Sequence, residues 1–275
     1  MENPQDQSIA NSRERQSDAD GYWHDRLSRS FNLQGVGLIG RSLAFNRWGY
    51  RARRAALGRL VSDASGARVL DVGSGTGYWI DHWHRLGAAA VSGLDLTELS
   101  VDRLRLTFPG DRFERADIRV SIPFEGPFDL ISAIDVLLHV TDDDGYRSGL
   151  ANLREVAAPG ARLVLLEPIS SGRPRPMAPG ADSRTRSLAE VEEALGATGW
   201  TLERRFPTTW LLSNPVEVEP RAAYLILSAW WAALRPAYRS ELMSSIVCPP
   251  IYWVDRLLCQ LQWSPSSKAI LARAI

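Results

Sequence analysis

The chain has 275 residues, of which 45% are hydrophobic and 23% are charged, proportions typical of a globular protein and not of a disordered, collagenous or membrane-spanning one. Its 32 Lys and Arg residues balance 32 Asp and Glu residues, so net charge favours neither nucleic acid nor a membrane as a partner. The two cysteines, Cys248 and Cys259, have no C-x-x-C spacing and no neighbouring histidines, and we expect no metal site.

The first 18 residues are polar, and we expect a disordered tail there, because they hold nothing whose burial would offset the entropy of ordering. They lack the apolar stretch of a secretory signal. Nowhere do eighteen uncharged apolar residues follow one another. These features predict a cytoplasmic protein with reduced thiols.

Residues 19–64 are predicted to form a helical lid ahead of the core. Aromatic residues, including Tyr22, Trp23, Phe45 and Trp48, stand in helical segments that a glycine-rich stretch at 34–40 interrupts. This segment has no strand pattern, and we expect it to precede the main domain as a separate helical layer.

From residue 65 onward, short apolar runs alternate with amphipathic stretches, the pattern of a parallel sheet covered by helices on both faces. The predicted strands are 67–71, 90–95, 112–117, 128–133, 162–167, 200–206 and 269–274. The predicted helices are 78–86, 98–108, 143–157 and 188–197. The expected fold class is α/β, with a Rossmann-like, mostly parallel sheet of about seven strands.

An aromatic-rich segment at 211–263 separates the last two predicted strands. Its residues, among them Trp230, Trp231, Tyr252 and Trp253, stand mostly at helical spacing. We therefore expect a helical cap inserted before the last strand, with the core formed by residues 65–210 and 264–275. Such a cap predicts an apolar mouth for any neighbouring pocket.

The most specific signal is the run VLDVGSGTG at 69–77, where a buried strand turns into a helix. Glycines let the backbone approach a ligand where a side chain would collide, and the start of the following helix presents unpaired N–H groups. The run therefore predicts a nucleotide or cofactor pocket.

The spacing within this run separates two kinds of cofactor. A dinucleotide fingerprint needs glycine or alanine at the sixth position, where this chain has Tyr78, and Asp71 stands two residues before the first glycine. An acidic group there disfavours a pyrophosphate and suits a cofactor that carries an ammonium group and no phosphate. S-adenosylmethionine fits this description.

Residues 67–167 resemble the class I S-adenosylmethionine-dependent methyltransferases. LDVGSGTG is similar to the first motif of that family, whose glycine loop wraps the methionine part of the cofactor. The resemblance implies that five residues of this loop hold the cofactor: Asp71, Gly73, Ser74, Gly75 and Gly77.

The ends of the next three strands match the same family. Asp95 corresponds to the acidic residue that takes both ribose hydroxyls, with Leu96 against the adenine. Asp117 and Ile118 match the segment whose acidic side chain meets the adenine amino group. Ile134 and Asp135 end the fourth strand, where the family places the reacting methyl group near the substrate; the resemblance implies a cofactor contact for Ile134 and a catalytic position for Asp135.

Shorter patches resemble a subgroup that modifies sugars and secondary metabolites, in which the helical preface acts as a lid. These patches are DVLLHVTDDD, NLREVAAPGARLVLLEP and SPSSKAILARA, with Ala161 where many relatives have a second glycine. The likeness implies a small-molecule acceptor, apolar or glycosylated. The sequence does not define an oligomeric state.

His139 is the best candidate for a general base, because it stands one helical turn beyond Asp135 and a histidine can remove the proton of an alcohol or phenol. A bond from His139 to the backbone is the alternative. His82 and His84 are predicted to be structural, and His24 could approach the pocket from the lid.

Arginines offer two further binding possibilities. Those at 173, 175, 184 and 186 follow the fifth strand and could hold an anionic acceptor group, whereas Arg47, Arg51 and Arg53 could meet the cofactor carboxylate. For both sets the alternative is a solvated surface.

The sequence thus predicts an S-adenosylmethionine-dependent methyltransferase that modifies a hydroxyl oxygen of a small molecule and uses no metal. Three alternatives stay open: methylation at carbon or nitrogen, a cofactor-binding protein without catalysis, and a dehydrogenase.

Overall fold

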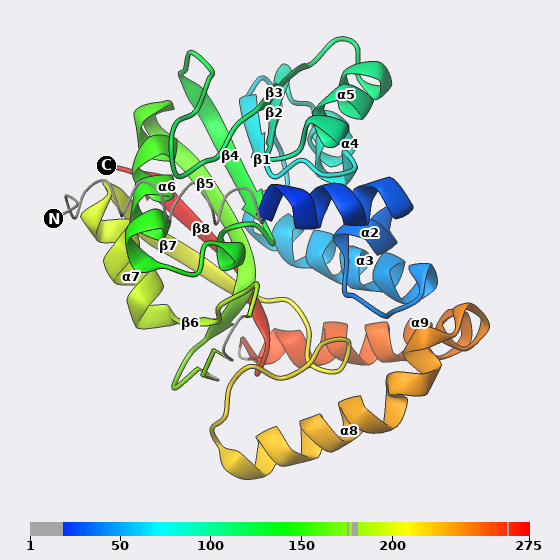
Figure 1. Cartoon of the computed structure of the whole chain (residues 1–275). Helices are drawn as coiled ribbons and strands as arrows, with labels where there is room; N and C mark the ends of the chain where they lie inside the picture. Colours follow the sequence, from blue (N-terminus) through cyan, green and yellow to red (C-terminus); the bar gives the residue numbers. More distant parts are fainter. Residues whose placement is uncertain (1–18, 175, 178–180, 263) are drawn as a thin grey trace, which may run out of the picture.

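The computed structural model describes residues 19–174, 176–177, 181–262 and 264–275. Arg175 and the expected tail at 1–18 lie outside these residues. A central sheet with the strand order β3-β2-β1-β4-β5-β8-β7 forms the middle layer, and the short β6 pairs with β5 (Figure 1). The strands are β1 Arg68–Val72, β2 Ala90–Asp95, β3 Arg112–Arg115, β4 Phe128–Ile134, β5 Ala157–Ser170, β6 Arg186–Ser187, β7 Trp200–Pro207 and β8 Ser267–Ala274.

The first five strands of the sheet run parallel, and β8 lies antiparallel between β5 and β7. The expected α/β fold with a mostly parallel sheet is confirmed. Two details differ from the sequence-based expectation. The two-residue β6 was not predicted, and β5 is longer than the expected 162–167 because its first residues also pair with β4, beyond an irregularity between Phe128 and Leu130.

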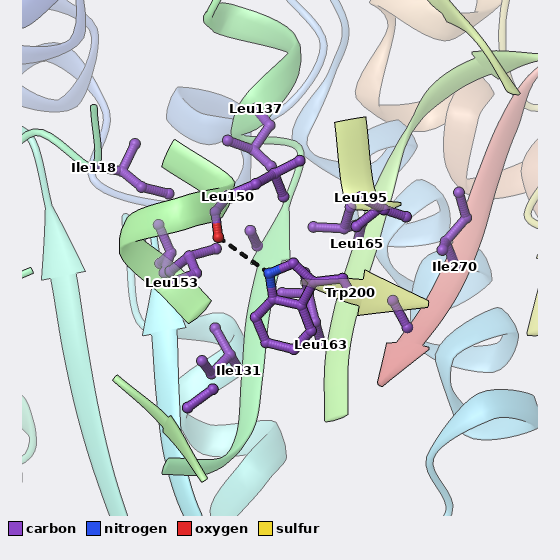
Figure 2. Close-up of a cluster of buried hydrophobic side chains, with 14 of the residues drawn as sticks. Ile118, Ile131, Leu137, Leu150, Leu153, Leu163, Leu165, Leu195, Trp200 and Ile270 are labelled. Atoms are coloured by element: carbon purple, nitrogen blue, oxygen red, sulfur yellow. Dashed lines mark hydrogen bonds between the residues drawn. The ribbon is translucent and has the colours of Figure 1, made fainter. Parts of the chain in front are cut away.

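Helices cover both faces of the sheet. One face carries α6 (Asp143–Glu155) and α7 (Leu188–Ala197). Figure 2 shows Trp200 in this layer, where its indole Nε1 donates to the Leu150 carbonyl oxygen at 3.1 Å. The other face carries α3 (Leu43–Leu60), α4 (Tyr78–Arg85) and α5 (Glu98–Thr107).

The N-terminal segment runs from a helix at 19–29 through α2 (Leu33–Val36) into α3. Ser42 caps α3 by accepting the Phe45 backbone N–H. The C-terminal insertion is a helical hairpin of α8 (Arg221–Arg239) and α9 (Glu241–Leu258), followed by the short 3-10 helix η2 (Cys259–Leu261).

A third cluster of apolar side chains joins this hairpin to the body of the protein. Phe45 on α3 packs against Trp231 and Tyr238 of α8, with ring centroids 5.9 Å and 4.6 Å apart. Because α9 also packs along α3, the hairpin lies beside α3, where Figure 1 shows it in orange.

The only lysine of the chain, Lys268, lies buried on β8. Its Nζ donates to Glu217 Oε1 and to the Ile169 carbonyl oxygen, each at 2.6 Å. Burial lowers the pKa of Lys268, and the Glu217 carboxylate raises it. The ion pair fixes the loop before α8 to β8, the last strand of the chain.

Candidate functional site

A pocket of about 580 Å³ lies at the carboxyl ends of β1 to β4, beneath the helix at 19–29. Ligands of open α/β sheets bind at this edge, and the volume is in the range of small-molecule sites. The glycine loop, the ends of four strands and the N-terminal helix all contribute to its wall.

The backbone of the glycine loop requires glycine at its turns. Gly73, Gly75 and Gly77 have φ values of +67°, +52° and +81°, in the left-handed region that favours glycine. A Cβ on Gly73 would lie 2.4 Å from a Val136 methyl group, and one on Gly77 would lie 2.6 Å from the Phe108 ring. Gly73, Ser74 and Gly75 line the pocket, whereas Gly77 lies behind it as the N-cap of α4.

Asp71 also lies behind the loop and not on the pocket wall, in contrast to its expected contact with the cofactor. Its side chain is buried because β1 directs it into the sheet layer, where Oδ1 accepts a hydrogen bond from Ser132 Oγ at 2.5 Å. Ser132 Oγ in turn accepts from Trp83 Nε1 at 3.0 Å. Burial raises the pKa of Asp71 to about 7. The geometry therefore gives Asp71 a supporting position.

Asp95 lines the pocket at the end of β2, as the sequence predicts for a ribose-binding carboxylate. Its Oδ2 accepts the Gly75 N–H at 2.8 Å, and its Oδ1 accepts the backbone N–H and hydroxyl of Thr97, both at 2.9 Å. Burial raises the pKa of Asp95, and these donors lower it. The carboxylate thus holds the glycine loop in place while it faces the pocket. Three apolar residues expected at the cofactor also line the wall: Leu96, Ile118 and Ile134.

Asp117 lies on the wall but already has a cationic partner. Arg119 Nε lies 3.0 Å from both carboxylate oxygens of Asp117, and Arg119 Nη2 lies 2.6 Å from Oδ2. This pairing raises the pKa of Arg119. An adenine amino group at Asp117 would therefore share the carboxylate with the guanidinium, and Arg119 itself lines the pocket.

Asp135 and His139 stand at the opposite part of the pocket, on the segment that follows β4. Asp135 has a φ of +57° and pairs with Arg53 of α3, whose Nε lies 2.5 Å from Asp135 Oδ2. His139 Nδ1 lies 2.8 Å from the carbonyl oxygen of Asp182. A carbonyl can only accept, so Nδ1 carries the proton in the neutral ring and Nε2 has the free lone pair.

The N-terminal helix closes the pocket above His139. The Trp23 ring meets the His139 ring edge to face, with centroids 5.0 Å apart. Asp20 pairs with Arg115 at the end of β3 at 2.8 Å. The buried side chain of Leu27 completes the contact of this helix with the pocket.

The remaining histidines lie elsewhere. His24 is exposed and does not line the pocket. His82 is buried against Trp79 and Trp83, and burial lowers its pKa to about 4. His84 pairs with Asp111 at 2.6 Å.

The candidate arginines mostly have internal or surface roles. Arg184 pairs with Asp143 and Glu190, and the buried Arg186 donates to the Val140 carbonyl oxygen at 2.8 Å. Arg173 lines a separate surface hollow. Arg47 and Arg51 are exposed, and Arg53 is held by Asp135.

The sequence did not predict three contacts in the pocket: Trp23 with His139, Asp182 with His139, and Arg53 with Asp135. Trp23 stood out only as one aromatic residue of a helical segment, and no local pattern connects Asp182 to His139, which is 43 positions away. The only available signal for Arg53 was its place in a run of arginines on α3.

The charges of the pocket wall fit a cationic cofactor. Five carboxylates line it: Asp95, Asp117, Asp135, Asp142 and Asp182. Of these, Asp117 pairs with Arg119 and Asp135 pairs with Arg53. This excess of negative charge suits a sulfonium and an ammonium group and disfavours a pyrophosphate. Within the described ranges, no cluster of His, Cys, Asp and Glu could hold a metal ion, and no helix is long and apolar enough to cross a membrane.

Comparison with known proteins gives the family. Residues 45–212 match the model of a methyltransferase domain. An O-methyltransferase of Penicillium expansum is 32% identical over 121 residues, 42% of each protein. The malonyl-[acyl-carrier protein] O-methyltransferase of Erwinia pyrifoliae is 28% identical over 207 residues, 67% of this chain and 75% of the relative. The chain thus spans less than half of the fungal relative's length.

A solved structure of similar fold is magnesium protoporphyrin IX methyltransferase from Synechocystis with bound S-adenosylmethionine. It has a TM-score of 0.58 and 15% sequence identity, with 95% of this chain and 97% of that chain covered.

Proposed function

This chain belongs to the methyltransferase domain family of class I S-adenosylmethionine-dependent enzymes, and we propose that it methylates a hydroxyl oxygen of a small organic acceptor. The observation that carries the proposal is the 2.8 Å contact between His139 Nδ1 and the Asp182 carbonyl oxygen, which leaves Nε2 to take a proton at the pocket wall. Two relatives named as O-methyltransferases support the choice of oxygen.

S-adenosylmethionine, when bound, supplies an electrophilic methyl group on a sulfonium. Gly73, Ser74 and Gly75 would hold its methionine part, because the backbone of this loop forms the wall without intervening side chains. Asp95 would accept hydrogen bonds from ribose hydroxyls, and Leu96 and Ile118 would cover the adenine.

The acceptor would lie between His139, Asp135 and Trp23. His139 Nε2 would take the hydroxyl proton as the acceptor oxygen receives the methyl group that the cofactor supplies from its sulfur, and the Asp182 carbonyl would stabilise the imidazolium through its bond to Nδ1. Arg53 holds the Asp135 carboxylate in place through the 2.5 Å ion pair. Alignment of the acceptor supplies most of the acceleration, about 7 to 11 kcal/mol, and a positioned base adds about two to four powers of ten.

The wall of the acceptor region is apolar on one side. Trp23 and Val140 present hydrocarbon surface there, and Trp23 is fixed by its contact with His139. An aromatic or otherwise apolar acceptor, such as a secondary metabolite or the aglycone of a glycoside, would be buried well against it. The hairpin of α8 and α9 does not contribute to this wall, so the expected role of the inserted cap at the pocket mouth falls to the N-terminal helix.

His139→Ala tests the base. The purified protein is incubated with methyl-labelled cofactor and a fractionated small-molecule extract, and labelled products are identified by mass spectrometry. We expect turnover to fall by about 10²-fold or more with cofactor affinity kept. His24→Ala, on the exposed side of the N-terminal helix, is the matched control and should keep full turnover. Full turnover in His139→Ala would remove His139 as the base.

Methylation at nitrogen is the second candidate. Asp135, Asp142 and Asp182 line the same pocket as His139, and their negative charge favours an amine-bearing acceptor. The labelled product distinguishes the two, because its fragmentation in the mass spectrometer places the labelled methyl group on oxygen or on nitrogen. Cofactor binding with no labelled product from any fraction would instead indicate a non-catalytic binding protein.

A further inference from the structure

The outer surface of the helical hairpin is unusually apolar. Of the 16 large hydrophobic residues exposed in the described part of the chain, ten lie between Leu225 and Leu261. We call six of them the hairpin face: Leu225, Ile226, Leu242, Ile246, Trp253 and Leu257. A concentration of exposed apolar side chains on one pair of helices is typical of a surface that a partner covers.

On α9 the exposed apolar residues form one stripe. Leu242, Ile246, Trp253 and Leu257 follow one another at intervals of four, seven and four residues, which places them on one side of a helix. Their exposed fractions are 60% to 70%. The opposite side of α9 is buried toward α3, so this helix is apolar on both sides.

On α8 exposed apolar residues stand beside arginines. Leu225, Ile226 and Trp230 are exposed, whereas Leu227 and Trp231 turn inward. Helical periodicity places the exposed Arg221, Arg235 and Arg239 on one side of α8, next to Leu225.

The charges of the hairpin are mostly of one sign. Arg221, Arg235, Arg239 and the partly exposed Arg256 are basic, and Asp255 is buried, where it accepts the backbone N–H groups of residues 210–212. The exposed acidic residue of the two helices is Glu241, which accepts the Ala44 N–H.

Positive charge also gathers beside the turn of the hairpin. Burial and the neighbouring guanidinium groups of Arg235 and Arg239 lower the pKa of Arg41. The Arg41 guanidinium lies over the Trp231 ring of α8, 5.1 Å from its centroid, and the Ser42 N–H donates to the Tyr238 carbonyl oxygen, so Arg41 stands at the same end of α8 as Arg235 and Arg239.

We propose that the hairpin face binds the surface of an anionic lipid bilayer, with its apolar side chains in the boundary between headgroups and acyl chains and its arginines at the lipid phosphates. A basic edge beside an apolar stripe with tryptophan is the pattern of helices that lie in this boundary. A second copy of the chain fits less well, because it would bring a second set of arginines without matching exposed carboxylates.

The balance of charge over the whole chain, from which we expected no membrane partner, hides this local excess. Binding would be peripheral. Because the hairpin face and the pocket share no residue, membrane binding and methyl transfer can be tested separately.

The test is co-sedimentation of the full chain with vesicles. We expect binding to phosphatidylglycerol–phosphatidylcholine vesicles, at least tenfold weaker binding to pure phosphatidylcholine, and weakening by salt. The triple variant Leu242→Ser, Trp253→Ser, Leu257→Ser should reduce binding at least tenfold. Arg235→Gln with Arg239→Gln should reduce binding to the anionic vesicles alone.

The matched control is Leu106→Ser with Val120→Ser, which removes two exposed apolar side chains from other parts of the molecule and should bind like the wild type. Thermal melts and cofactor titration check that each variant is folded. Wild-type protein that stays in the supernatant would overturn the proposal. So would a wild-type dimer that the triple variant converts to a monomer, because the second copy would then be the occupant of the face.

Discussion

The pocket and the helical hairpin treat polar and apolar groups in opposite ways. At the pocket, carboxylates such as Asp71 and Asp95 are withdrawn from water and held by hydroxyl or backbone donors. At the hairpin, Leu242 and Trp253 remain exposed although apolar. Both arrangements cost free energy in the isolated chain. The difference teaches that the carboxylates around the glycine loop are buried at a cost that their donors offset within the chain, whereas the exposed apolar side chains of the hairpin have no such compensation and call for a larger partner.

The sharpest way to break the pocket side of this comparison is Gly73→Ala. The added Cβ would lie 2.4 Å from a Val136 methyl group, and the alanine would have to adopt a φ of +67°, so the loop must move. We expect cofactor affinity to fall by about two powers of ten, which corresponds to about 2.7 kcal/mol, in calorimetric titration.

Gly40→Ala is the control for backbone strain alone. Its φ is +65°, but its Cβ would meet nothing within 4 Å. Affinity should be unchanged there. Equal losses of cofactor affinity in both variants would show that the loss at Gly73 comes from backbone strain and not from the contact with Val136.

Two tryptophans of the hairpin separate its inner from its outer surface. Trp231→Ala removes a side chain that is 8% exposed, and we expect the free energy of unfolding to fall by about 3 kcal/mol. Trp253→Ala, at a position 65% exposed, should change it by less than about 0.5 kcal/mol. Urea unfolding measures both, and a large loss in Trp253→Ala would show that the outer surface already packs within the chain.

Glu167 is buried on β5, three residues before that strand ends. Burial raises its pKa to about 8, so the folded state favours the protonated acid. The stability this gives is complete below the ordinary pKa near 4.5 and is lost as the pH rises through about 8. Glu167→Gln should therefore melt at a higher temperature than the wild type at pH 9, with a smaller difference at pH 6. The same difference in melting temperature between variant and wild type at both pH values would contradict a raised pKa for Glu167.

The sequence predicted what depends on neighbouring residues. The strand, glycine turn and helix around residues 69–77 form a local unit, and the ends of parallel strands meet at one edge, so Asp95 and Ile134 could be placed at the pocket in advance. Helix and strand limits were harder to predict: α6 ends at Glu155, because the chain must pair with Phe128 from Ala157 onward.

The partners of the side chains could not be predicted. Arg53 and Asp135 lie 82 positions apart and meet only because α3 crosses the sheet edge. Similarly, the alternation of β1 decided that Asp71 would lie behind the loop, since one residue's shift in register would have turned it to the other face. The hairpin was predicted as helical, but its docking on α3 instead of the pocket follows from tertiary packing.

Lys268 has a practical consequence. Because the chain's only side-chain amine is enclosed by Glu217 and backbone carbonyls, reagents that acylate lysine can reach it only when β8 separates from its neighbours. The rate of Lys268 acylation therefore reports how often β8 opens, and peptide mass spectrometry can measure it without an introduced label.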